Sequence, residues 1–225
     1  MSASEIQPFE VALPGQLPVR GFLHLPAKPY GDGLVLTHGA GANCQSPLLL
    51  ALAIAFCDSG LAVLRCDLPF RQAKPHGPPS RGSADDDQEG LWRAVEAMRR
   101  QVPGRIFLGG HSYGGRQASM LAASQPGLVD GLLLLSYPLH PPKRADQPRT
   151  AHFPSLQTSS LFVHGTRDGF GTSEEMTAAL KLIPATTELL TVPSAGHDLL
   201  TNRNRAELPK LLVDKFLSAL GRTQT

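Results

Sequence analysis

The sequence predicts an α/β fold in which a mainly parallel, twisted sheet is covered by helices on both faces. Short apolar segments alternate with segments of helical periodicity through most of the chain, and polar or glycine-rich loops follow several of the apolar segments. Parallel strands need crossover connections, which helices supply on the two sides of the sheet. We therefore expect the functional loops to gather at the carboxyl ends of the strands.

The elements can be placed from local composition. An antiparallel hairpin is expected from Phe9–Leu13 and Leu17–Leu25, turned at Pro14-Gly15. The later strands are short apolar runs: Leu34–Thr37, Leu61–Cys66, Ile106–Leu108, Gly131–Leu135, Leu161–His164 and Glu188–Val192. The helices repeat apolar residues every three or four positions: Pro47–Asp58, Asp86–Arg100, Gly115–Ala123, Ser173–Leu182 and Glu207–Leu220. The stretch Ala73–Asp87 is rich in Pro, Gly, Ser and Asp, which predicts a mobile surface loop.

Ser112 lies at the centre of the motif Gly110-His111-Ser112-Tyr113-Gly114. An apolar run, Arg105–Leu108, precedes the motif, and the helical segment Gly115–Ala123 follows it. The two glycines allow a sharp strand-to-helix turn, and the helix N-terminus favours negative charge near the serine. The motif predicts a nucleophile elbow with Ser112 as nucleophile, and the alternative is a tight packing turn.

Two later motifs supply an acid and a base. Asp168 ends a polar loop after the apolar run Ser159–His164, and His197 lies in the loop after Thr187–Val192. A carboxylate can fix the tautomer of a histidine, and a histidine exchanges protons near neutral pH. We predict a catalytic triad in which Asp168 orients His197. The alternatives are an aspartate that caps the helix near Thr172 and a histidine that is merely exposed.

The glycine-rich turn His38–Asn43 follows an early apolar run and predicts an oxyanion loop. The predicted donors are the backbone N–H groups of Tyr113 and Ala40, with Gly41 as the close rival of Ala40. The alternative is that the glycines only allow the turn. His38 precedes the nucleophile and abuts the glycines, so it is predicted to be a structural loop histidine.

These motifs resemble those of the α/β-hydrolases, and within that superfamily the dienelactone-hydrolase-like group. A closer likeness is to the testis-expressed and non-specific-lethal-complex hydrolase-like family, carried by four motifs: His38–Gly41, Asp67–Arg71, Gly110–Gly115 and Val163–Asp168. The resemblance implies hydrolysis of an ester or related acyl substrate without a cofactor. It also implies an alternative, because this family includes a scaffold protein. Dienelactone hydrolases use a cysteine nucleophile, and Ser112 at the elbow argues against that reaction.

The length of 225 residues fits one domain, 1–225, with the hairpin in 1–25 and a short lid-like insertion in 137–159. So short an insertion predicts a minimal lid and an open cleft. The candidates for lining the substrate pocket are Gly41, Phe70, Arg71, His111 and Tyr137.

Composition excludes several other classes of function. The formal charge of +2 comes with no basic run, so we expect no nucleic-acid partner. No signal segment or membrane-length apolar run is present, which predicts a cytoplasmic protein without a membrane partner. Three cysteines are too few for a disulfide framework, and we find no metal-ligand cluster at usable spacing.

Together these observations predict a cofactor-free serine hydrolase of the carboxylesterase type that acts on a small-molecule ester or acyl substrate. Esters and thioesters are favoured over amides because the chain shows no peptide-binding module. The competing hypothesis is a non-catalytic scaffold that keeps the hydrolase fold for interactions. The oligomeric state and the natural substrate stay open.

Overall fold

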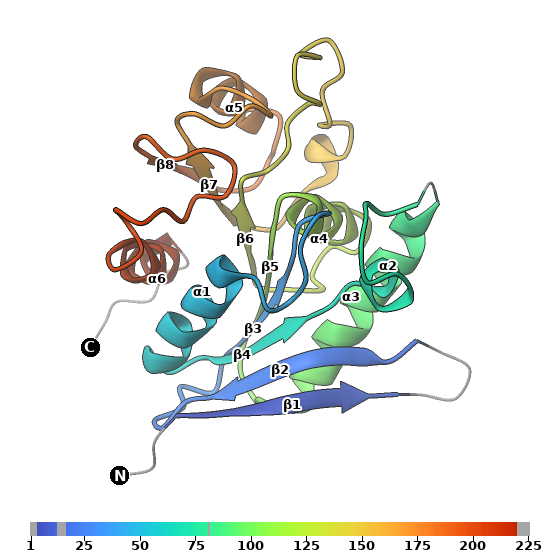
Figure 1. The fold of residues 1–225 in the computed structure, drawn as a ribbon, viewed down its shortest axis with the longest axis vertical. Coiled ribbons are helices and arrows are strands. Elements are labelled where there is room, and N and C mark those ends of the chain that lie inside the picture. Colours follow the sequence, from blue (N-terminus) through green and yellow to red (C-terminus); the bar gives the residue numbers. More distant parts are fainter. Residues whose placement is uncertain (1–3, 13–16, 81, 220–225) are drawn as a thin grey trace.

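The computed structural model describes residues 4–12, 17–80 and 82–219. One eight-stranded sheet runs through them in the order β1-β2-β4-β3-β5-β6-β7-β8 (Figure 1). The strands are β1 (Glu5–Val11), β2 (Val19–Leu25), β3 (Gly33–Thr37), β4 (Ala62–Cys66), β5 (Ile106–His111), β6 (Gly131–Leu135), β7 (Ser160–Gly165) and β8 (Thr187–Val192). β1 and β2 are antiparallel to their neighbours, and all later pairs are parallel. The predicted hairpin therefore forms, although its turn at Pro14-Gly15 lies outside the described residues.

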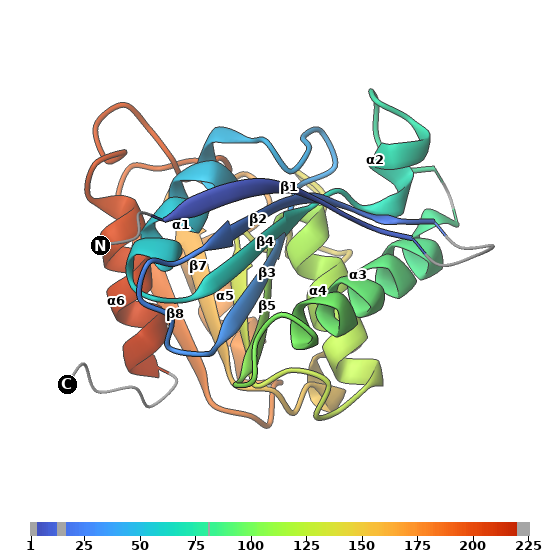
Figure 2. The same ribbon diagram turned by 90° about the horizontal axis from the view of Figure 1, so that it is seen from below.

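Helices cover both faces of the sheet, as Figure 2 shows for α1 and α6 on one side and α3 and α4 on the other. Their bounds are α1 (Pro47–Asp58), α2 (Pro69–Ala73), α3 (Ser83–Arg99), α4 (Tyr113–Ser124), α5 (Ser173–Leu180) and α6 (Leu208–Ala219). The predicted fold class, a mainly parallel sheet covered on both faces, is confirmed. Among the described residues, no helix combines the length and the apolar character that crossing a bilayer requires.

Two apolar clusters follow from the alternation of side chains along the buried strands. Val35, Leu108 and Leu134 join the cluster under α3, α4 and α5, whereas their chain neighbours join the cluster under α1 and α6. Successive strand side chains point to opposite faces, so a strand buried on both faces is apolar throughout. This explains why β6 consists of Gly131 followed by four leucines, all buried.

The stretch predicted to be a mobile loop, Ala73–Asp87, is only partly a loop. α2 ends at Ala73, and α3 begins at Ser83, three residues before the predicted start. The acidic residues Asp85 and Asp86 lie in the first turn of α3, where the helix dipole favours negative charge. Asp87 is fully buried, and hydrogen bonds from the Phe70 N–H and the Tyr113 O–H satisfy its carboxylate there.

The insertion 137–159 contains no helix longer than the 3-10 turn η1 (Phe153–Ser155) in the structure. Its first residue, Tyr137, lies in the core against Phe153 and Phe162, with ring centroids 5.3 and 5.9 Å apart. The segment therefore packs onto the body of the protein, and the described residues form no separate lid domain over the carboxyl edge of the sheet.

Burial of His24 on β2 predicts a loss of stability in acid. His24 is 1% exposed, and its Nε2 accepts a hydrogen bond from Arg65 Nε at 2.9 Å. Burial, assisted by the Arg65 charge, lowers the pKa of His24 to about 4. Between pH 6.5 and pH 4, His24 is protonated in the unfolded chain but neutral in the folded protein. Its contribution to the free energy of unfolding is therefore fully present above about pH 6.5 and is lost as the pH falls towards 4.

We expect this histidine to account for a loss of up to about 3 kcal/mol between pH 7 and pH 4. Urea unfolding across this pH range should show a smaller fall in the free energy of unfolding for His24→Gln than for the wild type. The glutamine side-chain oxygen can still accept the Arg65 hydrogen bond. Parallel stability curves for the two proteins would show that His24 does not control the loss.

Candidate active site

Ser112 occupies a strained turn between β5 and α4. Its backbone has φ 51° and ψ −115°, a conformation that non-glycine residues rarely adopt. The Ser112 N–H donates to the Leu135 carbonyl at 2.8 Å, and its carbonyl accepts the Arg116 N–H at 3.0 Å. The serine is therefore held in place from both sides of the turn.

Gly114 allows the elbow to lie against the strand that carries the glycine-rich loop. A Cβ atom at Gly114 would lie 2.5 Å from the His38 carbonyl oxygen and 2.7 Å from Thr37 Cγ2. Backbone atoms cannot rotate away as a flexible side chain would. The elbow and the loop after β3 can approach this closely only because residue 114 has no side chain.

We expect Gly114→Ala to destabilise the protein by about 1–3 kcal/mol, because it overpacks this contact. It should also lower the predicted hydrolase activity more than the change in folded fraction explains, since the elbow must move. Thermal unfolding and a hydrolase assay measure the two effects. Gly127→Ala is a control with open space at the Cβ position but a positive φ of 83°, so it should lower stability without lowering activity. Unchanged stability in Gly114→Ala would contradict the argument.

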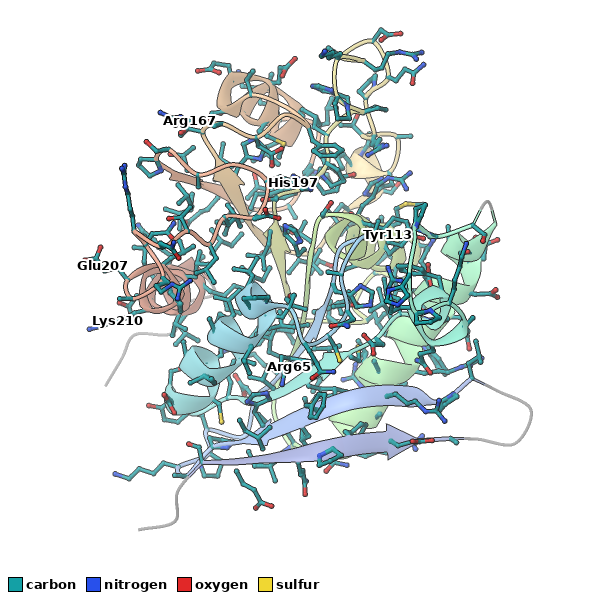
Figure 3. The ribbon with its side chains drawn as sticks, viewed as in Figure 1. Arg65, Tyr113, Arg167, His197, Glu207 and Lys210 are labelled. Atoms are coloured by element: carbon teal, nitrogen blue, oxygen red, sulfur yellow. The ribbon has the colours of Figure 1, made fainter. Side chains whose placement is uncertain are left out.

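The structure brings Ser112, His197 and Asp168 into one hydrogen-bonded chain. His197 Nε2 lies 2.7 Å from Ser112 Oγ, and His197 Nδ1 lies 2.8 Å from Asp168 Oδ2. The three residues follow β5, β8 and β7, and the loops beyond the carboxyl ends of these strands meet at one edge of the sheet. His197 and Tyr113, labelled in Figure 3, both lie near this edge.

The environment of Asp168 keeps its carboxylate ionised. Its side chain is fully buried, which by itself raises its pKa. Hydrogen bonds from His197 and from the Phe170 N–H, the latter at 2.9 Å to Oδ1, outweigh this effect and hold the pKa below its ordinary value. An ionised acceptor at Asp168 requires the proton on His197 Nδ1, which leaves Nε2 free to accept a proton from Ser112.

Two side chains position His197 in addition to Asp168. The Phe170 ring lies 4.3 Å from the His197 ring, with 32° between their planes. His111 Nε2 donates to the His197 carbonyl at 2.8 Å. His111 was predicted to line the pocket, and the structure shows that it also holds the base loop. The sequence reasoning missed Phe170, whose only local signal is an aromatic residue two positions after the acid.

The glycine-rich loop after β3 presents free backbone donors near the serine. Within the described part of the chain, the N–H groups of Ala40, Gly41 and Tyr113 donate to no protein acceptor. The loop is close to the elbow, since a Cβ atom at Gly39 would lie 3.4 Å from Ser112 Cβ. Both Ala40 and its rival Gly41 thus keep an N–H available to a ligand.

His38 is a structural histidine in this arrangement. It is fully buried, its Nε2 accepts the Leu68 N–H at 3.1 Å, and its Nδ1 lies 2.9 Å from the Gly39 carbonyl oxygen. The ring therefore carries its proton on Nδ1 and ties the loop to the segment before α2.

Three of the predicted pocket residues are buried. Phe70 is 7% exposed and packs against His38 and Tyr113, while Arg71 is 6% exposed and donates to backbone carbonyls. The prediction for Tyr137 is corrected by its 1% exposure and by its O–H, which donates to the Arg149 carbonyl. Their burial follows from long-range packing that the local sequence does not show.

A cavity of about 410 Å³ reaches His111 and Asp198, the chain neighbours of Ser112 and His197. It is lined by His111, by Ala42 of the glycine-rich loop and by Asp198, which follows His197 in the chain. The rest of its lining comes from the start of α1 and from the loop before α6: Ser46, Pro47, Leu48, Leu200, Thr201, Asn202 and Arg205. This volume is within the range of small-molecule sites. Over the described residues, no group of three or more His, Cys, Asp or Glu side chains is arranged to hold a metal ion.

Comparisons with known proteins agree with this architecture. The chain is similar in structure to Est1E from Butyrivibrio proteoclasticus, with 16% identity, a TM-score of 0.76, and coverage of 96% of this chain and 99% of that one. It is also similar to a dienelactone hydrolase from Anabaena variabilis, with 19% identity, a TM-score of 0.76, and coverage of 96% of this chain and 99% of that one. A third similar structure is a serine hydrolase without a lid from Xanthomonas campestris, with 18% identity, a TM-score of 0.71, and coverage of 98% of this chain and 97% of that one. At these identities the likeness shows the fold.

The sequence itself carries the family assignment. A family model described as an alpha/beta hydrolase domain matches residues 31–220, which run from the segment before β3 through α6. The match includes the glycine-rich loop, the elbow, and the loops of Asp168 and His197. The chain belongs to the alpha/beta hydrolase domain family.

Proposed function

We propose that this protein is a serine hydrolase that cleaves a small carboxylic ester or related acyl substrate through an acyl-enzyme. The observation that carries the proposal is the hydrogen-bonded chain from Ser112 Oγ through His197 to Asp168. A buried carboxylate, a histidine of defined tautomer and a serine in a strained turn together form the arrangement that activates a hydroxyl for nucleophilic attack.

The geometry supports a two-step reaction. Ser112 Oγ attacks the carbonyl carbon while its proton passes to His197 Nε2, and the resulting imidazolium is stabilised by Asp168. The tetrahedral intermediate then collapses, and the alcohol leaves with the proton from His197. Water attacks the acyl-enzyme with His197 again as base, which releases the acid and restores Ser112.

The oxyanion of both tetrahedral intermediates needs backbone donors. We assign one to the Tyr113 N–H at the start of α4 and the other to the Ala40 N–H, with Gly41 as the rival. Each such donor supplies on the order of 3 kcal/mol of transition-state stabilisation. The free state of these N–H groups in the described chain supports this assignment.

The proposed substrate is small because the segment that could enclose the site is short. The short insertion 137–159 builds no enclosed channel for a long acyl chain, and the cavity of about 410 Å³ that reaches His111 and Asp198 has the volume of a small-molecule site. The neighbours with esterase and dienelactone hydrolase titles are consistent with acyl chemistry. The finer likeness to the testis-expressed and non-specific-lethal-complex hydrolase-like family still rests on the four motifs alone.

A series of p-nitrophenyl esters tests the proposal. We expect turnover of the acetate and butyrate by the wild type, a decline towards the octanoate and beyond, and no turnover by Ser112→Ala. Ser124→Ala, at the far end of the same helix, is a control that should retain activity. A folded wild type without activity on any ester of the series would favour the scaffold alternative.

A further inference from the structure

Arg71 on α2 has unusual partners for a buried cation. It is 6% exposed, and in the part of the chain that the structure describes it makes no ion pair with a carboxylate. Its guanidinium instead donates to four backbone carbonyls, two of which belong to the glycine-rich loop. Burial of a charge is unfavourable unless its hydrogen-bonding groups are satisfied, so these carbonyls are what keeps Arg71 in its place.

The contacts to the glycine-rich loop are short and specific. Arg71 Nη2 lies 2.7 Å from the Ala40 carbonyl oxygen, and Arg71 Nε lies 2.8 Å from that of Ala42. The other two contacts, to the carbonyls of Lys74 at 3.0 Å and Gly77 at 2.9 Å, anchor the guanidinium to the segment after α2. The fork of Arg71 therefore connects two segments that are about thirty residues apart in the chain.

These contacts determine the direction of the N–H groups in the loop. The carbonyl of one residue and the N–H of the next belong to one planar peptide unit and point in opposite directions. When Arg71 holds the Ala40 carbonyl, the Gly41 N–H must point away from Arg71. The His38 ring holds the Gly39 carbonyl at 2.9 Å and so orients the Ala40 N–H in the same manner.

The neighbouring residue Phe70 connects α2 to the other side of the proposed hole. The buried Asp87 carboxylate accepts the Phe70 N–H at 3.0 Å and the Tyr113 O–H at 2.7 Å. The rings of Phe70 and Tyr113 also contact each other, with centroids 5.6 Å apart. α2 is thus hydrogen-bonded to the glycine-rich loop and is linked through Asp87 to Tyr113, the residue after Ser112.

We propose that Arg71 is a positioning residue that holds the glycine-rich loop in the conformation required to bind the oxyanion. The inference rests on the proposed serine hydrolase function. Arg71 orients the Gly41 N–H directly, through the Ala40 carbonyl, and it acts on the Ala40 N–H by fixing the position of the loop that carries it. It was predicted to line the substrate pocket, and this role replaces that one.

Kinetics of Arg71→Met and Arg71→Lys on a short p-nitrophenyl ester test the inference. We expect kcat of Arg71→Met to fall by about 10- to 100-fold, with KM within threefold of the wild type. This loss does not exceed the loss that removal of a whole oxyanion donor causes, because the donor is misplaced and not deleted. The kcat of Arg71→Lys should lie between those of the wild type and Arg71→Met, because a lysine cannot donate to the two loop carbonyls and to the anchoring carbonyls at once. Arg99→Gln removes an arginine that donates to the Leu128 carbonyl outside the site, and it should retain full activity.

A trifluoromethyl ketone inhibitor separates positioning from general structural support. Its adduct with the serine carries an oxyanion, so its inhibition constant should weaken by the same factor as kcat in both Arg71 variants. Binding of the product acid should not change. If Arg71→Met does not fold, Arg71→Lys decides the question. A folded variant with kcat within threefold of the wild type, or with lower kcat but unchanged inhibition, would overturn the inference. An inactive wild type would instead refute the proposed function.

Discussion

Ser112→Ala is expected to lower kcat/KM for short esters by at least about 10⁴-fold, because it removes the hydroxyl that we propose forms the acyl-enzyme. The variant should fold, since alanine keeps the backbone hydrogen bonds of the elbow at Leu135 and Arg116. It also removes no buried hydrogen bond except the one to His197. Steady-state kinetics with circular dichroism measure the two properties together.

Ser124→Ala provides the matched control for this prediction. Ser124 lies in the last turn of α4, where its hydroxyl donates to the Leu121 carbonyl at 2.9 Å. The activity of Ser124→Ala should remain within about twofold of the wild type, because substitutions at the surface away from the site have small effects. Residual activity of Ser112→Ala above one hundredth of the wild type would mean that another residue is the nucleophile.

Asp168→Asn is expected to lower kcat by about 10³- to 10⁴-fold at neutral pH through a change of tautomer. Asp168 Oδ1 accepts the Phe170 N–H at 2.9 Å, and Oδ2 faces His197 Nδ1 at 2.8 Å. In the variant, the asparagine oxygen satisfies Phe170 and the NH₂ group faces His197. The base must then accept at Nδ1 and carry its proton on Nε2, where it cannot receive the proton of Ser112.

The pH dependence of kcat and a histidine NMR spectrum test this account. The spectrum should show the His197 proton on Nδ1 in the wild type and on Nε2 in Asp168→Asn. Asp58→Asn, at the exposed end of α1, should change neither activity nor tautomer. Activity of Asp168→Asn within tenfold of the wild type would show that Asp168 does not orient the base.

Much of the fold could be predicted because local patterns carry it. The bounds of α1 and β6 agree with the prediction, since both elements show a clear apolar period or run. α2 and η1 were not predicted because five and three residues are too few to show a period. The acidic start of α3 resembled a loop in composition, and the burial of Asp87 depends on Phe70 and Tyr113, which are distant in the chain.

The site was predictable to the extent that its residues follow strands. Ser112, Asp168 and His197 each come after an apolar run, and parallel strands place their carboxyl ends together. The residues that support the triad and the glycine-rich loop have no such local sequence pattern. The stacking of Phe170 on His197 and the contacts of Arg71 with the loop depend on how segments pack, which the chain does not reveal locally.

Covalent labelling with a fluorophosphonate probe, read by intact-protein mass and peptide mapping, tests the central claim most directly. The account predicts one adduct on the wild type, located at Ser112, with no adduct on Ser112→Ala and greatly slowed labelling of His197→Ala. A folded wild type that takes up no probe, or a Ser112→Ala variant that is labelled as fast as the wild type, would contradict it.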